Sequence, residues 1–209
     1  MSLRKVAAAL ETGPASLYAY VRDLDELHAL VLDRALAKVD LRVPRSGGWR
    51  EGVVRVLESY AHVLSASPGL ANLAFGTIAV GPNAMRVTEK LLDLLDQGGV
   101  DPASGAWAVD LVILYVTAIV AEHVDGLEPG APDGAVANAV ANASQGEFPR
   151  VFAARDHLLS GTGEERFAWA IEVFLRGIVA TPRPAPSPGK RAPSAKKPAR
   201  SKATPPRRT

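Results

Sequence analysis

The sequence predicts an all-α protein with a small N-terminal helical head, a helical-bundle domain and a basic tail that does not fold. Apolar residues recur every three to four positions over most of the chain, and no useful stretch alternates apolar and polar residues as a strand would. Its 209 residues, 47% of them hydrophobic, can bury one sizeable core beside a small head. We expect the head and its connecting helix over residues 1–43, the bundle over 44–181 and the tail over 182–209.

The first 21 residues predict two short helices joined by a tight turn. Ser2 is a good N-cap for a helix over residues 3–10, because its hydroxyl can accept from a free N–H of the first turn. Pro14 is suited to the first position of a second helix over residues 14–21. We expect the two helices to share a small core made of Val6, Leu10, Leu17 and Val21.

A third helix is predicted to follow directly. Asp23 is its expected N-cap, and Glu26, three residues on, completes the pattern of a capping box. The spacing is typical of a helix-turn-helix, whose second helix enters the DNA major groove. The predicted buried stripe of the third helix is Leu24, Leu27, Leu30, Val31 and Leu36. The candidate DNA-facing residues are Arg4, Ala15, Ser16, Tyr18, Tyr20 and Arg22.

The pattern RKVAAAL…GPASLYAYV..LDEL resembles the tetracycline-repressor (TetR) family of transcriptional regulators. Gly76-Thr77 and the segments VTEKLLDLLDQGGVD and FAWAIEVFLRGIVA resemble the ligand-binding domain of the branch closest to the tetracycline repressor, so the likeness spans residues 2–180. It implies a homodimeric repressor that a small molecule releases from its operator. The alternative for the motif by itself is two helices of an ordinary bundle.

The chain departs from the family pattern in its head. Family members carry another helix before this pair, whereas Met1 stands directly before the N-cap, so we expect a frayed head. Either the true start lies upstream, which we favour because the recognition helix is intact, or this is a helical ligand-binding dimer that has lost specific DNA binding. Glu11 replaces a usual glycine, and a left-handed conformation there would cost roughly 1–2 kcal/mol. Leu24 replaces a phosphate-contacting lysine, which leaves Arg22 as the nearest cation.

A ligand pocket is expected among the bundle helices that begin near Trp49, Pro82 and Pro102. A mostly apolar wall with a few polar groups is usual for a small-molecule site, although each residue singly could equally belong to the core. The resemblance places two histidines of the tetracycline site at Asp40 and Ala74, so tetracycline is not the expected ligand. The candidate pocket residues are Tyr60, Phe75, Met85, Trp107, Asp110, Tyr115 and Thr117.

Two helices have the composition of a dimer interface. The helix reaching to about residue 124 is apolar nearly all round over residues 111–121, and so must be covered on several sides. The last helix, over residues 164–180, carries a broad apolar stripe. Antiparallel pairing across a twofold axis would form a four-helix bundle; the alternative is packing within one monomer. The other expected helices cover 49–65, 68–75, 82–97 and 148–159, with a mobile loop over 126–146.

The net charge of +2 is the sum of an acidic main part and a basic C-terminal tail. Residues 183–209 hold nine Lys and Arg, seven Pro and no acidic residue, while residues 1–182 carry 15 basic and 22 acidic side chains, a net charge of −7. Such a tail should be extended and disordered. It could bind DNA phosphates without sequence preference, or it could simply aid solubility.

Neither an enzyme nor a membrane protein is expected. The sequence has no phosphate-binding glycine loop, nucleophile elbow or zinc-protease motif. Glu122-His123 places a carboxylate beside an imidazole, but adjacent helical residues point about 100° apart, so a capping or solvated histidine is the favoured interpretation and no metal or cofactor is predicted. The apolar run over residues 111–121 has 11 residues against the roughly 20 of a membrane span. The absence of cysteine fits a cytoplasmic location.

Overall fold

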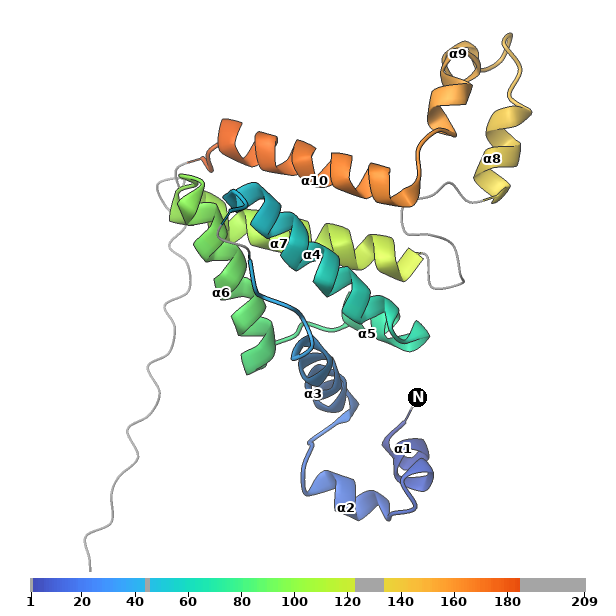
Figure 1. Ribbon diagram of the computed structural model, residues 1–209. Helices are drawn as coiled ribbons and strands as arrows, with labels where there is room; N and C mark the ends of the chain where they lie inside the picture. The colour runs from blue at the N-terminus through green and yellow to red at the C-terminus, as the bar shows by residue number, and fades with distance from the viewer. Residues whose placement is uncertain (1, 44–45, 123–133, 185–209) are drawn as a thin grey trace, which may run out of the picture.

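The computed structural model describes residues 2–43, 46–122 and 134–184, and every regular element within them is a helix. Helices α1 and α2 form a small head, α3 connects it to a bundle of α4, α5, α6, α7 and α10, and the α8–α9 pair stands away from that bundle (Figure 1). The predicted all-α class is confirmed. The helices are α1 (Leu3–Ala9), α2 (Pro14–Tyr18), α3 (Leu24–Leu36), α4 (Trp49–Ser65), α5 (Pro68–Gly76), α6 (Pro82–Gln97), α7 (Pro102–Glu122), α8 (Gly134–Ala141), α9 (Pro149–Leu158) and α10 (Gly163–Ala180).

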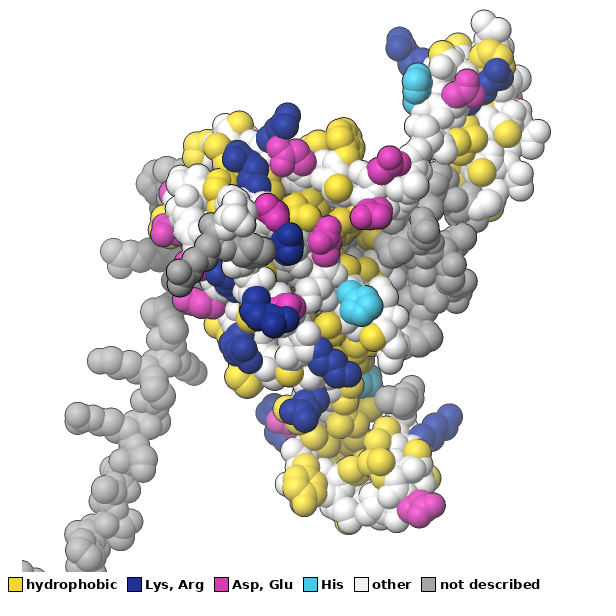
Figure 2. Space-filling view, viewed as in Figure 1, with side chains coloured by type: hydrophobic (Ala, Val, Ile, Leu, Met, Phe, Trp, Pro, Cys, Tyr) yellow, Lys and Arg dark blue, Asp and Glu magenta, His cyan; other side chains and the backbone are white. Residues whose placement is uncertain are grey.

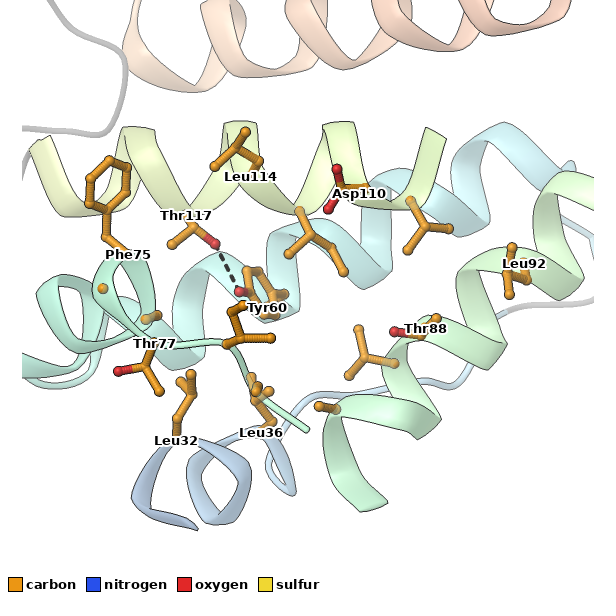
Figure 3. A pocket seen from close by; sticks show the side chains of 18 of the residues that line it. Leu32, Leu36, Tyr60, Phe75, Thr77, Thr88, Leu92, Asp110, Leu114 and Thr117 are labelled. Carbon is orange, nitrogen blue, oxygen red and sulfur yellow. Dashed lines mark hydrogen bonds between the residues drawn. The ribbon is translucent and has the colours of Figure 1, made fainter. Parts of the chain in front are cut away.

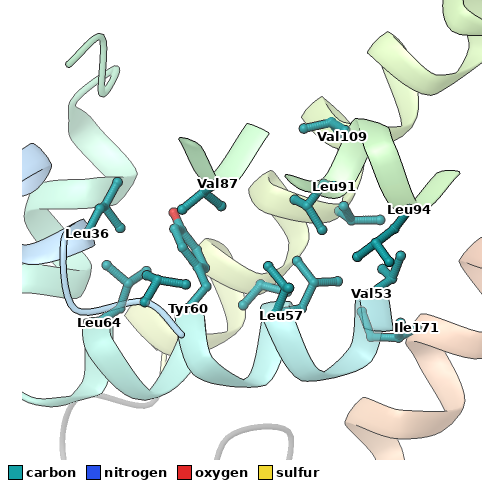
Figure 4. Close-up of a cluster of buried hydrophobic side chains, with 14 of the residues drawn as sticks. Leu36, Val53, Leu57, Tyr60, Leu64, Val87, Leu91, Leu94, Val109 and Ile171 are labelled. Atoms are coloured by element: carbon teal, nitrogen blue, oxygen red, sulfur yellow. The ribbon is translucent and has the colours of Figure 1, made fainter. Parts of the chain in front are cut away.

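The bundle core is centred on α4. Its residues Val53, Leu57, Tyr60 and Leu64 are all buried on one face, as their spacing requires. They meet side chains from α3, α6, α7 and α10 (Figure 4). The core partners labelled with them are Leu36, Val87, Leu91, Leu94, Val109 and Ile171.

Helix α7 is longer than its apolar run suggested. Asp101 caps it, with its Oδ1 atom accepting from the backbone N–H groups of Ala103 and Ser104, both at 3.1 Å. At 21 residues it is long and apolar enough to cross a membrane by length and composition alone, so the argument from an 11-residue run was wrong. Within the described chain, however, α7 packs on α4, α5, α6 and α10. Its position is that of a central bundle helix.

The loop predicted over residues 126–146 was wrong in part, because α8 lies within it. The alanine and valine residues of α8 allow a short helix that packs on α9. Residues 123–133, which include His123, lie outside the described chain, and so do residues 185–209, which make up most of the basic tail.

The head differs from its predicted packing. Leu3 and Ala7 form the buried face of α1, together with Val21, while Leu10 is 63% exposed at the end of the helix. Because α2 ends at Tyr18, Tyr20 lies in the following turn and not on the helix. The turn tightens there, since the N–H of Tyr20 donates to the carbonyl oxygen of Leu17 at 2.9 Å.

Helix α3 has the predicted cap but a different buried face. Asp23 Oδ1 accepts from the N–H of Glu26 at 2.8 Å, as expected. The Glu26 carboxylate accepts from the N–H of Arg22 at 2.6 Å instead of that of Asp23, so the capping box is not reciprocal. Leu30 and Val31, expected inside, are 52% and 47% exposed, because no described helix covers that side of α3. Figure 2 shows hydrophobic side chains at the surface around the head and its junction with the bundle.

Candidate ligand cavity and nucleic-acid interface

The bundle contains a cavity of about 540 Å³ beside the core. It lies between α3, α4, α6 and α7, and the end of α5 with the segment after it covers another side (Figure 3). Most of its lining is aliphatic, with a few hydroxyl groups and one carboxylate. This composition is usual for a site that binds a small organic molecule. The lining is Leu32, Leu36, Tyr60, Ala74, Phe75, Gly76, Thr77, Ile78, Ala79, Ala84, Val87, Thr88, Leu92, Ala106, Val109, Asp110, Ile113, Leu114 and Thr117.

A buried hydrogen bond joins two sides of this cavity. The Tyr60 hydroxyl on α4 and the Thr117 hydroxyl on α7 lie 2.8 Å apart. Burial raises the pKa of Tyr60, and the hydrogen bond to Thr117 opposes this only in part. The bond gives each hydroxyl a partner and joins α4 to α7 at the cavity.

Four of the seven predicted pocket residues line the cavity: Tyr60, Phe75, Asp110 and Thr117. The other three do not. Met85 is an exposed residue beside Leu41 and Lys90 on the outer side of α6. Trp107 lies in a groove between α7 and α10, with the Arg183 guanidinium 4.5 Å from its ring centre. Tyr115 packs edge-on against Phe174 of α10, with ring centres 4.8 Å apart.

Several residues that line the cavity were not predicted from the sequence. Leu32 and Leu36 reach the cavity from α3, although that helix begins at the head. Their i, i+4 spacing showed that they share one face of α3, but it could not show which part of the bundle that face contacts. On α6, Thr88 and Leu92 line the cavity, and a threonine among the apolar residues of that face was the corresponding signal.

Asp40 and Ala74, where the resemblance places two histidines of the tetracycline site, have other roles in this structure. Asp40 binds Arg42 through both carboxylate oxygens, at 2.8 and 2.7 Å, and these hydrogen bonds lower the pKa of Asp40 to about 2. Its N–H also donates to Ser59. Ala74 does line the cavity, but it offers only a methyl group. Among the described residues, no group of three or more His, Asp or Glu side chains could hold a metal ion.

Helix α3 is joined to α6 by the buried carboxylate of Asp33. Its Oδ1 atom accepts from the backbone N–H groups of Asn83 and Ala84, both at 2.9 Å. Its Oδ2 atom accepts from the Asn83 side-chain amide, also at 2.9 Å. A side chain of α3 therefore caps the N-terminus of α6, where the free N–H groups and the helix dipole favour a negative charge.

The predicted DNA-facing residues lie at the surface of the head. Ala15, Ser16 and Tyr18 are exposed on α2, and Arg4 is exposed on α1. Arg22 is also exposed, but its Nε atom binds Glu26 at 3.0 Å. Tyr20 is 82% exposed in the turn after α2. The exposed surface of α2 therefore carries small and hydroxyl-bearing side chains, among them Tyr18.

Exposed apolar side chains also occur on the two helices expected to form a dimer. On α7 they are Trp107, Leu111 and Leu114, which repeat at i, i+4 and i+7. On α10 they are Trp169, Val173 and Val179. These side chains are 43–70% exposed, although Arg183 lies over one face of Trp107, so both helices carry apolar surface beyond what the monomer core uses.

Residues 43–181 match the family described as the tetracyclin repressor-like C-terminal domain, which is more than half of the chain. The chain belongs to this family. The predicted TetR resemblance is therefore confirmed over the bundle domain. Two curated relatives agree: an HTH-type transcriptional regulator of Saccharopolyspora erythraea is 31% identical over 116 residues, and the HTH-type transcriptional repressor DrrR1 of Streptomyces coeruleorubidus is 32% identical over 117. Each match covers 56% of this chain and less than half of the relative, 49% and 43% respectively.

Solved TetR-family structures extend the likeness to the head. The transcription regulator SCO7704 of Streptomyces coelicolor has a TM-score of 0.74 at 37% identity, covering 89% of this chain and 88% of its own. ActR of Streptomyces coelicolor, in complex with actinorhodin, also has a TM-score of 0.74, at 32% identity, and covers 86% of this chain and 87% of its own. The fold of the whole described chain is therefore that of TetR-family regulators.

Proposed function

We propose that this protein is a homodimeric transcriptional repressor that binds operator DNA through its head and leaves it when a small molecule fills the bundle cavity. One observation carries the proposal: the cavity is lined by Leu32 and Leu36 of α3, the same helix that begins directly after the head. The proposed domains are a DNA-binding head with its connecting helix α3 over residues 1–43, a ligand-binding and dimerisation domain over 44–181, and a basic tail over 182–209.

The cavity can couple to the head because one ligand would touch both α3 and α6, the two helices that Asp33 joins. Leu32 and Leu36 flank Asp33 on α3, and Ala84 and Thr88 continue the helix that Asp33 caps. A molecule that fits the cavity better in one α3 orientation shifts the protein towards that orientation. A small rotation of α3 moves the head and changes the separation of the two heads in a dimer. Two half-sites one DNA turn apart, roughly 34–36 Å, tolerate little such change.

The head residues proposed to contact DNA are Arg4, Ala15, Ser16, Tyr18, Tyr20 and Arg22. Their exposure supports this role, and α2 with the turn before it has the arrangement of a recognition helix. Tyr20 would reach DNA from the turn, beside the backbone instead of within the groove. A second candidate function is a ligand-binding dimer without specific DNA binding, which the exposure of Leu10 in the head and of Leu30 and Val31 on α3 favours.

The proposed dimer interface is the apolar surface of α7 and α10. Trp107, Leu111 and Leu114 together with Trp169 and Val173 would be buried in a four-helix bundle with a second copy. Such an interface should bury well over 1,000 Å². We propose a cytoplasmic, non-enzymatic role, in keeping with a family of transcriptional regulators.

Binding to the DNA that flanks the gene tests the proposed recognition of an operator. Fluorescence anisotropy should detect one fragment that the protein binds in the presence of excess non-specific competitor DNA. Tyr18→Ala should weaken that binding about tenfold or more, since a base-facing side chain contributes roughly 1–3 kcal/mol. Lys38→Ala, an exposed cation beyond the end of α3, is the matched control. Equal affinity for all fragments would favour the second candidate function.

The proposed release from DNA by a ligand is tested with two fluorescent probes of similar size, dansylcadaverine and dansyl-6-aminohexanoate. Whichever of them occupies the cavity should lower operator affinity in the wild-type protein. Thr88→Trp, which fills the cavity from α6, should abolish both probe binding and this effect. Operator affinity that is unchanged while the cavity is occupied would contradict the proposed coupling.

A further inference from the structure

The cavity has a charge pattern that restricts its ligand. Among the described residues that line it, Asp110 is the only carboxylate, and none is Lys, Arg or His. The remaining polar groups are hydroxyls, and two of these, on Tyr60 and Thr117, are already bonded to each other. An anionic ligand would therefore find no cation to bind and one carboxylate to repel it.

Asp110 lines the cavity and has no hydrogen-bond or ion-pair partner among the described residues, whereas Glu58, Glu89 and Asp96, which also lack one, lie outside the cavity lining. Asp93 binds Lys90 at 2.9 Å, and Glu51 binds Arg55 at the same distance. Asp33 is occupied by the N-terminus of α6. Asp110 makes no hydrogen bond or ion pair with any described residue, so its acceptor capacity faces the cavity and water.

The position of Asp110 on α7 directs it towards the cavity. Ala106, Asp110, Ile113 and Thr117 repeat at helical spacing and all line this space, whereas Leu111, one residue further on, belongs to the exposed apolar face. Figure 3 shows Asp110 on α7 above the cavity, well separated from Phe75 towards the other end. The side chain is exposed, and the aliphatic wall beside it is suited to the apolar body of a ligand.

We propose that the effector is a largely apolar organic molecule carrying a protonated amine, and that the Asp110 carboxylate binds this amine. The inference rests on the proposed function, since it names the chemical class of the molecule that the cavity receives. A charged hydrogen bond at this position is stronger than the neutral ones that the threonine hydroxyls can offer. Thr88 and Thr77 would then orient the rest of the molecule from the facing side.

The test compares the two dansyl probes, which share an aromatic group and differ in the charge at the end of a similar chain. Dansylcadaverine ends in an ammonium group, and dansyl-6-aminohexanoate ends in a carboxylate. The wild-type chain should bind the ammonium probe at least about tenfold more tightly, which is the range for a hydrogen bond to a charged group. Asp110→Asn should remove that preference, and Asp110→Lys should reverse it.

Asp96→Asn is the matched control, because Asp96 is an exposed carboxylate on α6 outside the cavity lining. It should keep the wild-type preference. Ala106→Trp, at an exposed lining position, blocks the cavity as a second check beside Thr88→Trp, in case that variant does not fold. Circular dichroism verifies the helical content of each variant.

The outcomes separate the two proposals. If both blocking variants abolish probe binding but Asp110→Asn leaves the charge preference unchanged, the cavity binds ligands and the role of Asp110 is wrong. Tighter binding of the carboxylate probe by the wild-type chain would likewise overturn the amine proposal alone. If neither blocking variant affects either probe, the cavity does not receive them, and both proposals fail.

Discussion

The carboxylate of Asp33 occupies the space that a side chain at Gly81 would take. A Cβ atom added to Gly81 would overlap the Asp33 carboxylate, so a residue without a side chain is needed where α3 meets the start of α6. This close approach lets Asp33 reach the N–H groups of Asn83 and Ala84. The helix that leaves the head is thus fastened to a helix that lines the cavity.

Asp33→Ala should destabilise the protein by about 1–3 kcal/mol, because the first turn of α6 loses its cap and buried N–H groups lose their acceptor. Urea unfolding followed by circular dichroism measures the change. Asp33→Asn should cost less, since an amide oxygen can still accept one of the bonds. Gly81→Ala should also destabilise, but less so in an Asp33→Ala background where the overlap is gone. Additive effects of these two substitutions would show that the residues are not coupled.

Glu11→Gly should stabilise the head by up to about 1 kcal/mol. Glu11 has a φ of 52°, in the left-handed region that a residue with a Cβ atom adopts at a cost, and the more flexible unfolded chain of the glycine variant offsets part of the gain. Hydrogen exchange of the α1 amides should slow. Glu11→Ala is the control, because alanine keeps the Cβ atom and should bring no such protection.

Leu111→Asp should convert the proposed dimer to a monomer at micromolar concentration. The carboxylate would be placed in the apolar surface that α7 and α10 share, and burying it there without a partner is costly. Sedimentation velocity measures the outcome. Leu10→Asp, at a similarly exposed apolar residue of the head, should leave the oligomeric state unchanged. A wild-type protein that is already monomeric would refute the interface.

Stability should fall as the pH rises above about 10, and Tyr60 should be one cause. Burial raises the pKa of Tyr60 above its unfolded value, so the unfolded chain loses this proton first as the pH rises. The contribution is therefore present below the unfolded pKa and is lost above it. Tyr60→Phe should lower stability by about 1 kcal/mol at neutral pH, through the lost bond to Thr117, and flatten the fall between pH 9 and 11. Tyr18→Phe, at an exposed residue, should change neither.

Deleting residues 183–209 should weaken DNA binding about equally for all sequences and reduce its salt dependence. The tail contributes nine cations that can release counterions from phosphate without reading bases. Operator and non-specific affinities measured over a range of salt concentrations test this. An unchanged salt slope would mean that the tail does not touch DNA.

The sequence alone determined the helices and most of their ends, because the signals that set them are local. Ser2, Asp23 and Asp101 each cap a helix through N–H groups two or three residues away, and such short-range contacts can be read from the order of residues. The bounds of α4 and α6 followed in the same way from apolar spacing and flanking glycine and proline. Family membership was likewise visible in short segments of sequence.

The tertiary structure alone decided which faces of those helices meet. Helix α7 is apolar nearly all round, so its sequence has no preferred side, and a step of one residue turns a side chain by about 100°. This is why Asp110 and Thr117 line the cavity while Trp107 and Tyr115 lie towards α10. Asp33 and Asn83 are 50 residues apart, and their contact depends on how α3 packs against α6. Long-range packing therefore placed the cavity and the junction beside it, and no local pattern could have done so.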